Sequence, residues 1–256
     1  MVSKPSAGKA IKFALSDVYN NLGKVILTNL FWTACFVPCI LIGIQVRKSL
    51  SPLTFFVLFV SFLLTSPALG GIFHLSKKIA LNDPYIEATD FFQGIKEYWV
   101  KSFLLLVISL IIPILSGSAL IFYSQLAQAH PAGVVLWIVS LWAFIFFLLM
   151  QTYLFPLMVT QKMNVGKILK TSLLLALNNF GFTFVIVLVE ILLLALFSIT
   201  GIIFIGGVGT IALLQINAFI ELSKRYTGEE IKKERKREPR TVRQFFREIF
   251  QPWKYD

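Results

Sequence analysis

Six long apolar runs, separated by short polar segments, limit what this chain can fold into more than any other feature. Each run has about 20 residues, which is the length that a helix needs to cross a hydrocarbon core of about 30 Å. The runs are Val25–Val46, Leu53–Leu75, Phe103–Leu126, Ala132–Leu157, Phe180–Ile199 and Ile202–Leu222. We therefore predict an all-α integral membrane protein with six transmembrane helices. The last boundary is open, because the glycines within residues 198–210 allow either a turn or a re-entrant segment.

The composition argues against an ordinary soluble domain. Of the 256 residues, 57% are hydrophobic and only 14% are charged, and the mean hydropathy is +0.77. A soluble domain carries roughly a quarter charged residues on its surface. We do not expect the first apolar run to be a cleaved signal peptide. It begins only at about Val25, is longer than the apolar region of a signal peptide, and is followed by no small-x-small cleavage site.

The two cysteines, Cys35 and Cys39, lie four residues apart on one face of the first predicted span. Such a pair could bind a metal or carry a lipid. Since the chain has no further thiol and no histidine nearby, we interpret both as small apolar packing residues. The two histidines, His74 and His130, are predicted on opposite sides of the membrane and cannot share a metal. We therefore expect no metal site and no cofactor.

The basic residues are placed unevenly, and their placement predicts the orientation of the chain. The formal net charge is +11, from 24 basic and 13 acidic residues. If the amino terminus is inside, every basic residue except Arg47 and Lys48 falls on the cytoplasmic side. This is the positive-inside bias of a multi-pass protein, here of a bacterial cytoplasmic membrane, with both termini in the cytoplasm. The charge thus indicates topology and contact with anionic lipid, and we expect no nucleic-acid partner.

Three similar units divide the predicted membrane domain, residues 1–225, at about 10–80, 86–163 and 164–225. Each unit begins with an amphipathic stretch, expected to form an interfacial elbow helix, and continues as a transmembrane hairpin. The apolar positions of the stretches are Ile11, Leu15, Val18, Tyr19 and Leu22; Phe91, Phe92, Ile95, Tyr98 and Trp99; and Val165, Ile168, Leu169, Leu173 and Ala176. Lys12, Ser16, Asp17 and Asn20 are expected on the polar face of the first elbow. Asp90 is the expected N-cap of the second.

Polar landmarks recur in phase where each elbow turns into its hairpin. Asn20-Asn21-Leu22-Gly23 aligns with Asn178-Asn179-Phe180-Gly181, and more loosely with Glu97-Tyr98-Trp99-Val100. Self-similarity at a spacing of about 80 residues indicates one structural unit used three times. Within the first unit, Pro67 permits a kink, and it lies among small residues that would let another helix approach closely.

Residues 226–256 form a basic cytoplasmic tail, in which an amphipathic helix is predicted at 241–253. Its apolar stripe is opposed by arginines, and Thr241 with Gln244 resembles a capping box. Aromatic anchors opposite arginines are typical of a helix on an anionic leaflet, although the same face could dock on the protein's own elbows. The candidate lipid-headgroup contacts are Arg240, Arg243, Arg247, Phe246, Phe250 and Trp253.

Glu190 is the carboxylate nearest to mid-bilayer, and an intramembrane ionisable group is a functional candidate by default. Gln151 and Gln215 lie at a similar depth on other spans. One hypothesis makes Glu190 a proton or cation site of a transporter. The other makes it a protonated carboxyl that is hydrogen-bonded to a glutamine or a backbone carbonyl, because burial disfavours the charged form. Metalloprotease, hydrolase and phosphate-loop motifs are absent, so we expect no catalytic residue and no enzyme.

The first hundred residues resemble the YesL-like family of bacterial membrane proteins of unknown function. The resemblance is carried by Asn29-Leu30-Phe31-Trp32, by the run from Ser66 to Gly71 leading to Ser76-Lys77-Lys78, and by the following stretch with Phe91-Phe92 and Tyr98-Trp99. The chain departs from that family in having a full hairpin between the first two features and an extended basic tail. The resemblance implies an accessory or regulatory role beside a carbohydrate transporter. Together with the absence of catalytic motifs and the polar cytoplasmic face, it favours a non-enzymatic accessory or scaffold protein, beside a carbohydrate-uptake system. The alternative is a small-solute or lipid transporter that uses Glu190.

Overall fold

The computed structural model describes residues 5–46, 52–161 and 163–227, and all regular structure within them is helical. The helices are α1 (Ala7–Asn20), α2 (Leu22–Val46), α3 (Pro52–Leu63), α4 (Ser66–Leu81), α5 (Ala88–Ala129), α6 (Pro131–Thr160), α7 (Val165–Asn178), α8 (Phe180–Thr200), the short 3₁₀ helix η1 (Ile202–Phe204) and α9 (Gly207–Thr227). Within these residues, five stretches are long and apolar enough to cross a membrane: Leu22–Ile44, Phe56–Leu81, Ala88–Ala129, Pro131–Thr160 and Phe180–Thr200. The chain is a multi-pass membrane protein whose described part is helical.

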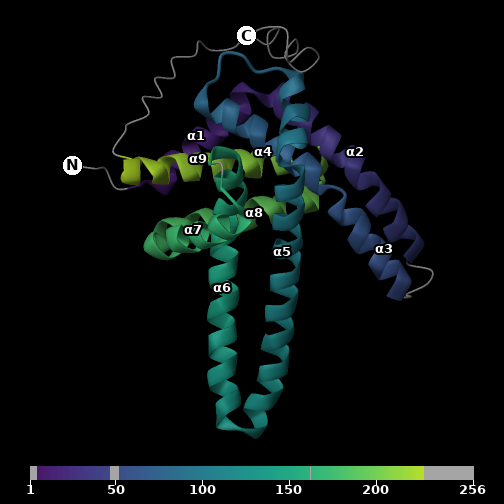
Figure 1. Ribbon diagram of the computed structural model, residues 1–256, viewed down its shortest axis with the longest axis vertical. Coiled ribbons are helices and arrows are strands. Elements are labelled where there is room, and N and C mark those ends of the chain that lie inside the picture. Colours follow the sequence, from purple (N-terminus) through teal and green to yellow (C-terminus); the bar gives the residue numbers. More distant parts are fainter. Residues whose placement is uncertain (1–4, 47–51, 162, 228–256) are drawn as a thin grey trace.

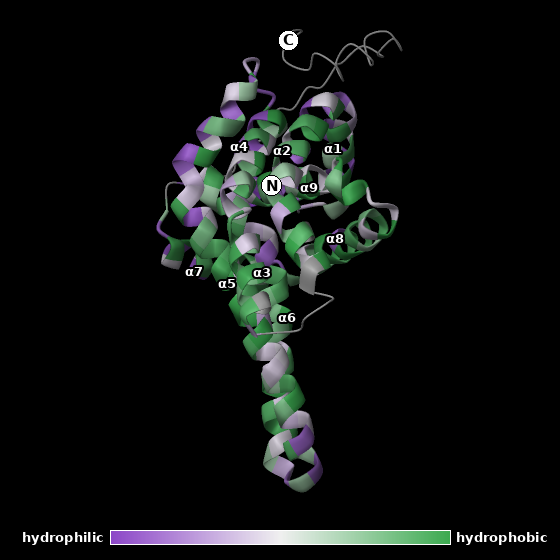
Figure 2. Ribbon diagram, turned by 90° about the vertical axis from the view of Figure 1, so that its right-hand side faces the viewer, coloured by the Kyte–Doolittle hydropathy of each residue, from purple (hydrophilic) through white to green (hydrophobic). Residues whose placement is uncertain are grey.

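The longest helices, α5 and α6, form a hairpin that projects far beyond the other helices (Figure 1). α5 has 42 residues, which corresponds to about 63 Å at 1.5 Å per residue. Figure 2 shows that the projecting part is largely hydrophobic and becomes more hydrophilic near its tip. Large side chains such as Ile114, Leu115, Val135 and Val139 are exposed along it, as expected for a surface in contact with lipid. The packed core lies at the other end of the hairpin, where α4 and α9 cross it.

The second predicted elbow is not a separate helix, so that prediction is wrong. α5 runs without a break through Glu97-Tyr98-Trp99-Val100, because this stretch lacks the asparagine pair that interrupts the other two units. Asp90 is also not the N-cap. Glu87 takes that position and Asp90 is the third helical residue, and the two carboxylates form a reciprocal capping box with each other's backbone N–H groups.

The helices at the first and third predicted elbows, α1 and α7, match each other closely. α1 and α7 both have 14 residues, and one asparagine separates each from the helix that follows. Asn21 (φ −126°, ψ 31°) and Asn179 (φ −131°, ψ 40°) share a non-helical backbone conformation. In each, Nδ2 donates to the carbonyl four residues earlier, at 3.0 Å and 3.1 Å respectively. The asparagines therefore provide an equivalent local device for turning the chain at both positions.

Helix α9 occupies the centre of the body. Every residue from Ala212 to Leu222 is buried, and the helix packs against α1, α2, α4, α6 and α8. Its surroundings are thus protein on all sides, which explains how it carries the buried polar residues Gln215, Asn217 and Glu221. Both α8 and α9 run across the direction of the α5–α6 hairpin rather than alongside it (Figure 1). The predicted sixth span, Ile202–Leu222, is not among the five apolar stretches and stays a prediction.

A tight turn joins α8 to α9, so residues 198–210 do not form a long re-entrant loop. α8 ends at Thr200, and Gly201 adopts a left-handed conformation (φ 73°) that favours glycine. Helix α2 holds this turn from the side. Asn29 donates from Nδ2 to the carbonyl of Ile203 at 2.9 Å and accepts from the N–H of Gly209 at 3.0 Å. Thr33 donates to the carbonyl of Phe204 at 2.7 Å, so two polar side chains of a predicted span fix a connection far away in sequence.

Helices α4 and α5 cross at glycines, which confirms the close approach predicted around Pro67. The chain breaks between α3 and α4, with Pro67 in the first turn of α4. A Cβ atom added to Gly71 would lie 2.7 Å from Phe91, and one added to Gly94 would lie 2.5 Å from Cβ of His74 and 3.0 Å from Cα of Gly71. Only glycine lets the two backbones come this near.

The orientation predicted for α1 is wrong in one respect. Asp17 was expected on the polar outer face, yet it is buried together with Ala10 and Ala14 against α9 and α8. Asn217 of α9 donates to Oδ2 of Asp17 at 2.8 Å. The small side chains allow close contact, and the amide of Asn217 gives the carboxylate a partner. The large apolar residues Leu15 and Tyr19 are exposed instead.

Candidate functional site

The inner face of α8 carries a polar stripe that leads to Glu190. Asn179, Thr183, Ile186 and Glu190 follow one another at spacings of four, three and four residues and are all buried. The stripe is polar except at Ile186, which is fully buried and separates Glu190 from the two residues nearer the start of the helix. The periodicity of the sequence did not single out this face, because leucine, valine and phenylalanine surround it on both sides.

Glu190 is 8% exposed and contacts Gln215 of α9, whose Nε2 donates to Oε2 at 3.2 Å. The hydroxyl of Thr152 on α6 faces the same carboxyl, although without hydrogen-bond geometry. Within the described part of the chain, Oε1 of Glu190, Oε1 of Gln215 and Oγ1 of Thr152 are buried with no hydrogen-bond partner. A protonated carboxyl would supply one additional donor to this group of oxygens.

Of the two glutamines predicted near Glu190, the structure brings only Gln215 to it. Gln151 lies one position before Thr152 on α6 and bonds in another direction, accepting at 2.8 Å from the hydroxyl of Ser109 on α5. It thus links the two helices of the projecting hairpin. Position along the sequence indicated the right depth for both glutamines, but the face of α6 that each residue occupies decides their partners.

A hydrogen-bonded chain at the start of α8 was missed from the sequence. Tyr153 of α6 is fully buried, and its hydroxyl lies 2.7 Å from that of Thr183. Asn179 donates to the hydroxyl of Tyr226 at 2.9 Å and accepts from Nη1 of Arg225 at 2.8 Å. The end of α9 is therefore anchored at the break between α7 and α8. The repeated asparagine pair was a signal for this position, although not for its partners.

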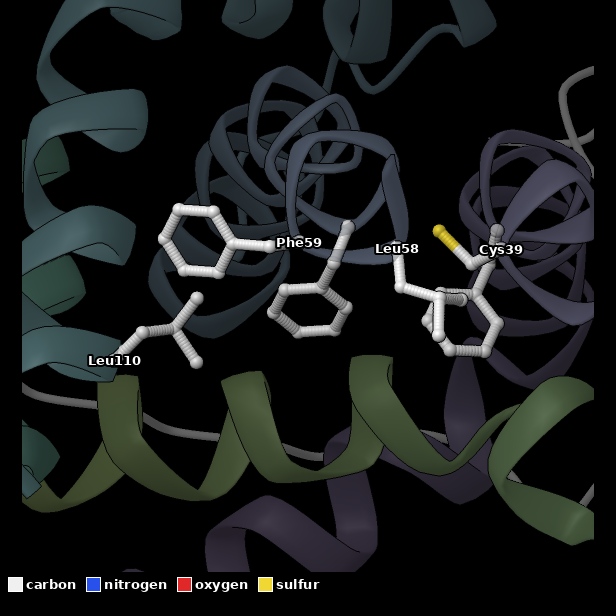
Figure 3. A pocket seen from close by; sticks show the side chains of 6 residues that line it. Cys39, Leu58, Phe59 and Leu110 are labelled. Atoms are coloured by element: carbon white, nitrogen blue, oxygen red, sulfur yellow. The ribbon is translucent and has the colours of Figure 1, made fainter. Parts of the chain in front are cut away.

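Two apolar hollows lie away from Glu190. The larger, of about 390 Å³, is lined by side chains of α2, α3 and α5: Phe36, Cys39, Leu58, Phe59, Phe62 and Leu110 (Figure 3). The smaller, of about 110 Å³, lies between α1, α8 and α9. Glu190 lines neither. The two cysteines differ in exposure, because Cys39 is buried at the larger hollow and Cys35 is exposed.

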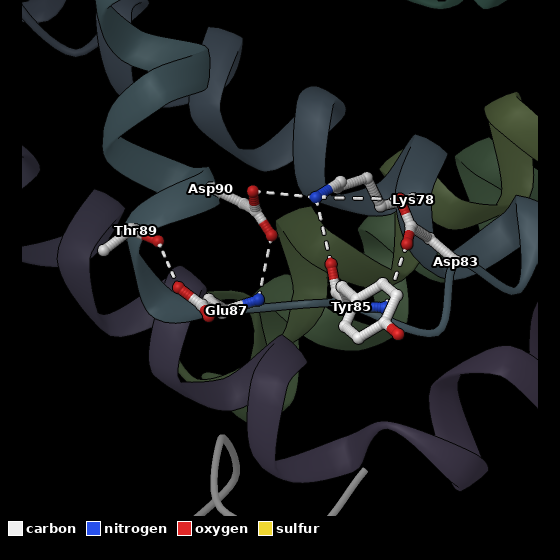
Figure 4. Close-up of polar contacts among 6 residues, drawn as sticks. All are labelled: Lys78, Asp83, Tyr85, Glu87, Thr89 and Asp90. Atoms are coloured by element: carbon white, nitrogen blue, oxygen red, sulfur yellow. Dashed lines mark hydrogen bonds and ion pairs between the residues drawn. The ribbon is translucent and has the colours of Figure 1, made fainter.

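A charged cluster fixes the connection between α4 and α5 (Figure 4). Nζ of Lys78 donates to Oδ1 of Asp90 at 2.8 Å and to the carbonyl of Tyr85 at 3.0 Å, and it lies 3.6 Å from Oδ2 of Asp83. Asp83 in turn accepts from the N–H of Tyr85 at 2.9 Å. These contacts satisfy both carboxylates and the loop backbone, which indicates a structural role. In the described ranges, no three of His, Cys, Asp and Glu lie together as a metal site would require.

The candidate headgroup contacts of the tail, from Arg240 to Trp253, lie outside the described residues, and the predicted helix at 241–253 stays a prediction. The resemblance to the YesL-like family is likewise a prediction, carried only by the residues quoted for it. Comparison with known proteins gives no match to a family model, to a curated protein or to a solved structure.

Proposed function

We propose that the protein is a non-enzymatic membrane scaffold or accessory subunit that acts beside a carbohydrate-uptake system. The observation that carries this proposal is the contact between Glu190 and Gln215. A transporter that uses a carboxyl group needs a path between that group and water, whereas Glu190 is buried in the packed body and bonded to the neighbouring helix. The link to carbohydrate uptake rests on the resemblance to the YesL-like family.

We further propose that the chain crosses a bacterial cytoplasmic membrane six times, as three hairpins with both termini in the cytoplasm. In this arrangement α1 and α7 are the elbows that lead the first and third hairpins, whereas the second hairpin begins directly with the continuous helix α5. Charge supports an even number of crossings, since five would place the strongly basic tail outside, against the positive-inside bias. α9 has 21 residues, or about 32 Å, and is long enough for the sixth crossing.

Mild detergent extraction of the tagged protein from a bacterial host, followed by mass spectrometry of co-purifying proteins, tests the scaffold role. We expect a transporter subunit in fixed stoichiometry that stays bound during size-exclusion chromatography. An unrelated multi-pass protein with the same tag serves as the control for non-specific capture. The variant Glu190→Gln should retain the partner, because the carboxyl has no part in the contact. A monodisperse protein that carries lipid alone would contradict the scaffold role.

A small-solute or lipid transporter is the second candidate, and the unpartnered oxygens around Glu190 favour it. A proton on Glu190, together with a bound water or cation, would supply the partners that Oε1 of Glu190, Oε1 of Gln215 and Oγ1 of Thr152 lack. Proteoliposomes that contain the purified protein and an internal pH dye test this alternative. A transporter would give a proton flux that Glu190→Gln abolishes and that Gln151→Leu, on the other face of α6, preserves. Equal leakage from all three proteins and from empty vesicles would exclude proton-coupled transport.

A further inference from the structure

The outward faces of α1 and α7 each carry two lysines followed by two large apolar residues, at the same spacings. On α1 these are Lys9, Lys12, Leu15 and Tyr19, and on α7 they are Lys167, Lys170, Leu173 and Leu177. All eight side chains are exposed. On each helix the opposite face is buried, through Ala10, Ala14 and Asp17 on α1 and Ile168, Ser172 and Ala176 on α7. Packing against the body therefore explains the inner faces, whereas each outer face exposes two lysines together with two large apolar side chains.

Each outer face separates charge from apolar surface along the helix rather than around it. The two lysines lie one turn apart near the start, where side chains three residues apart are neighbours. The large apolar residues follow toward the end, with Tyr19 about 15 Å beyond Lys9. Neither helix has an acidic residue in its first turn. Among the described residues, no ion pair engages any of these four lysines.

We propose that these two faces are equivalent binding sites for an anionic glycerophospholipid. The lysine pair holds the phosphate, and the acyl chain lies along the leucine and the tyrosine or leucine that follow. A helix lying flat at the interface would need its charged and apolar residues on opposite faces. Here they share one face, so the helix start lies at the level of the headgroups and the helix end lies deeper, where the chain continues into α2 or α8. This arrangement replaces the flat elbow expected from the sequence.

The site takes lipid in preference to free phosphate because half of each face is apolar. The aliphatic stems of the lysines already place apolar carbon beside the charge. Leu15 is 55% and Tyr19 62% exposed, and a soluble anion would leave this apolar surface in contact with water. Each lysine near an anionic surface contributes about fivefold in affinity. Loss of one pair should thus weaken lipid binding roughly thirtyfold, and the two sites should respond independently because they lie on different helices.

Native mass spectrometry of the full-length protein, released from nanodiscs of phosphatidylcholine doped with phosphatidylglycerol, counts the retained anionic lipids. The variants are Lys9→Gln with Lys12→Gln, Lys167→Gln with Lys170→Gln, and all four together. We expect each pair to remove one retained phosphatidylglycerol and the fourfold variant to remove two. The matched control, Lys96→Gln with Lys101→Gln on α5, removes the same charge outside the sites and should retain both lipids. The wild-type protein should also retain both lipids when inorganic phosphate is added.

Equal retention by the paired variants and the control would overturn the proposal, and displacement of lipid by inorganic phosphate would assign the lysines to a soluble anion instead. A second measurement tests the depth. Nitroxide labels on cysteines introduced at Gly8, Leu15, Gly166 and Leu173, in a chain with Cys35 and Cys39 replaced by alanine, report immersion by power saturation. We expect Leu15 and Leu173 to lie deeper than Gly8 and Gly166. Equal depths along each helix would also overturn the proposal.

Discussion

At the scale of single residues, a carboxyl group in a membrane interior persists only where its surroundings remove or satisfy its charge. Glu190 depends on one contact, with Gln215, and on the absence of neighbouring charge. Within the described residues, no lysine or arginine forms an ion pair with Glu190. An amide partner stabilises a neutral carboxyl without the desolvation cost of a buried ion pair.

Replacing Glu190 by glutamine should leave folding nearly intact, because glutamine keeps an acceptor, adds donors and has a similar volume. Replacing it by lysine should be badly tolerated, since an unpaired cation near mid-bilayer costs about 3 kcal/mol on insertion scales. The yield of monodisperse protein in detergent, measured by fluorescence-detected chromatography, distinguishes the two variants. Failure of the glutamine variant to fold would show that the carboxyl is not neutral.

The glycine crossing of α4 and α5 gives a second residue-scale prediction. Gly94→Ala should destabilise the fold by about 1–3 kcal/mol, because the added Cβ meets His74 and the backbone of Gly71. Gly117→Ala, in the same helix, is the matched control. A Cβ there meets nothing within 4 Å, and alanine favours the helix by about 1 kcal/mol. Unfolding by a detergent titration should rank Gly117→Ala at or above the wild type and Gly94→Ala below it, and equal stabilities would contradict the close crossing.

At the scale of elements, the sequence predicted helices and breaks well where a residue acts locally. The asparagines at 21 and 179 bond their own preceding turn, so their effect is visible in a short stretch of sequence. The second unit shows the limit. Its stripe was read as amphipathic, but amphipathicity does not indicate where a helix ends, and α5 continues to Ala129. Asp17 and Asn29 were beyond prediction because their partners, Asn217 and the turn at 203–209, come almost 200 residues later.

The amphipathic pattern at 241–253 predicts an element that can be tested alone. A peptide of residues 239–256 should become helical on vesicles with anionic lipid and bind neutral vesicles more weakly, because its arginines add about 1 kcal/mol each near such a surface. Raised salt should remove part of the affinity, since it screens charge but leaves burial of the aromatic residues unchanged. Phe246→Ser with Phe250→Ser should abolish binding at any salt. Circular dichroism measures the helicity of the peptide, and a sedimentation assay measures its binding to vesicles. A peptide that stays unstructured on anionic vesicles would favour docking of this segment on the predicted elbows.

At the scale of the whole molecule, hydropathy located the apolar stretches but not what surrounds each helix. Five of the predicted spans coincide with the stretches able to cross a membrane. The sixth coincides largely with α9, whose sequence is apolar enough to suggest lipid but whose neighbours on all sides are helices of the same chain. A helix enclosed by protein and one enclosed by lipid both need apolar side chains. α9 differs from a lipid-facing helix in its buried residues Gln215, Asn217 and Glu221. Gln215 and Asn217 reach Glu190 and Asp17 only in the assembled body.

Cysteine labelling from outside intact cells tests the orientation. In a chain without native cysteines, residues placed at Gln128 and Thr200 should react with a membrane-impermeant maleimide. Asp83, Asn164 and Asp256 should be spared, because the positive-inside bias places them in the cytoplasm. Labelling at Asp83 would show that the orientation of the chain is opposite to the one proposed. Labelling at Asp256 alone would mean that α9 does not cross and that the number of spans is odd.

The bonds from Asn29 to the turn before α9 have a consequence for the protein while it is being made. Gly209 is 180 residues beyond Asn29, a length that a ribosome synthesises in about 9 to 36 s at 5–20 residues per second. Throughout that interval α2 carries the amide of Asn29 before the carbonyl of Ile203 and the N–H of Gly209, which this amide will bind, have been translated. The amino-terminal half must wait in a partly assembled state inside the membrane. The amino-terminal helices reach their final packing only after α9 has been synthesised, so assembly ends with the last helix rather than proceeding hairpin by hairpin.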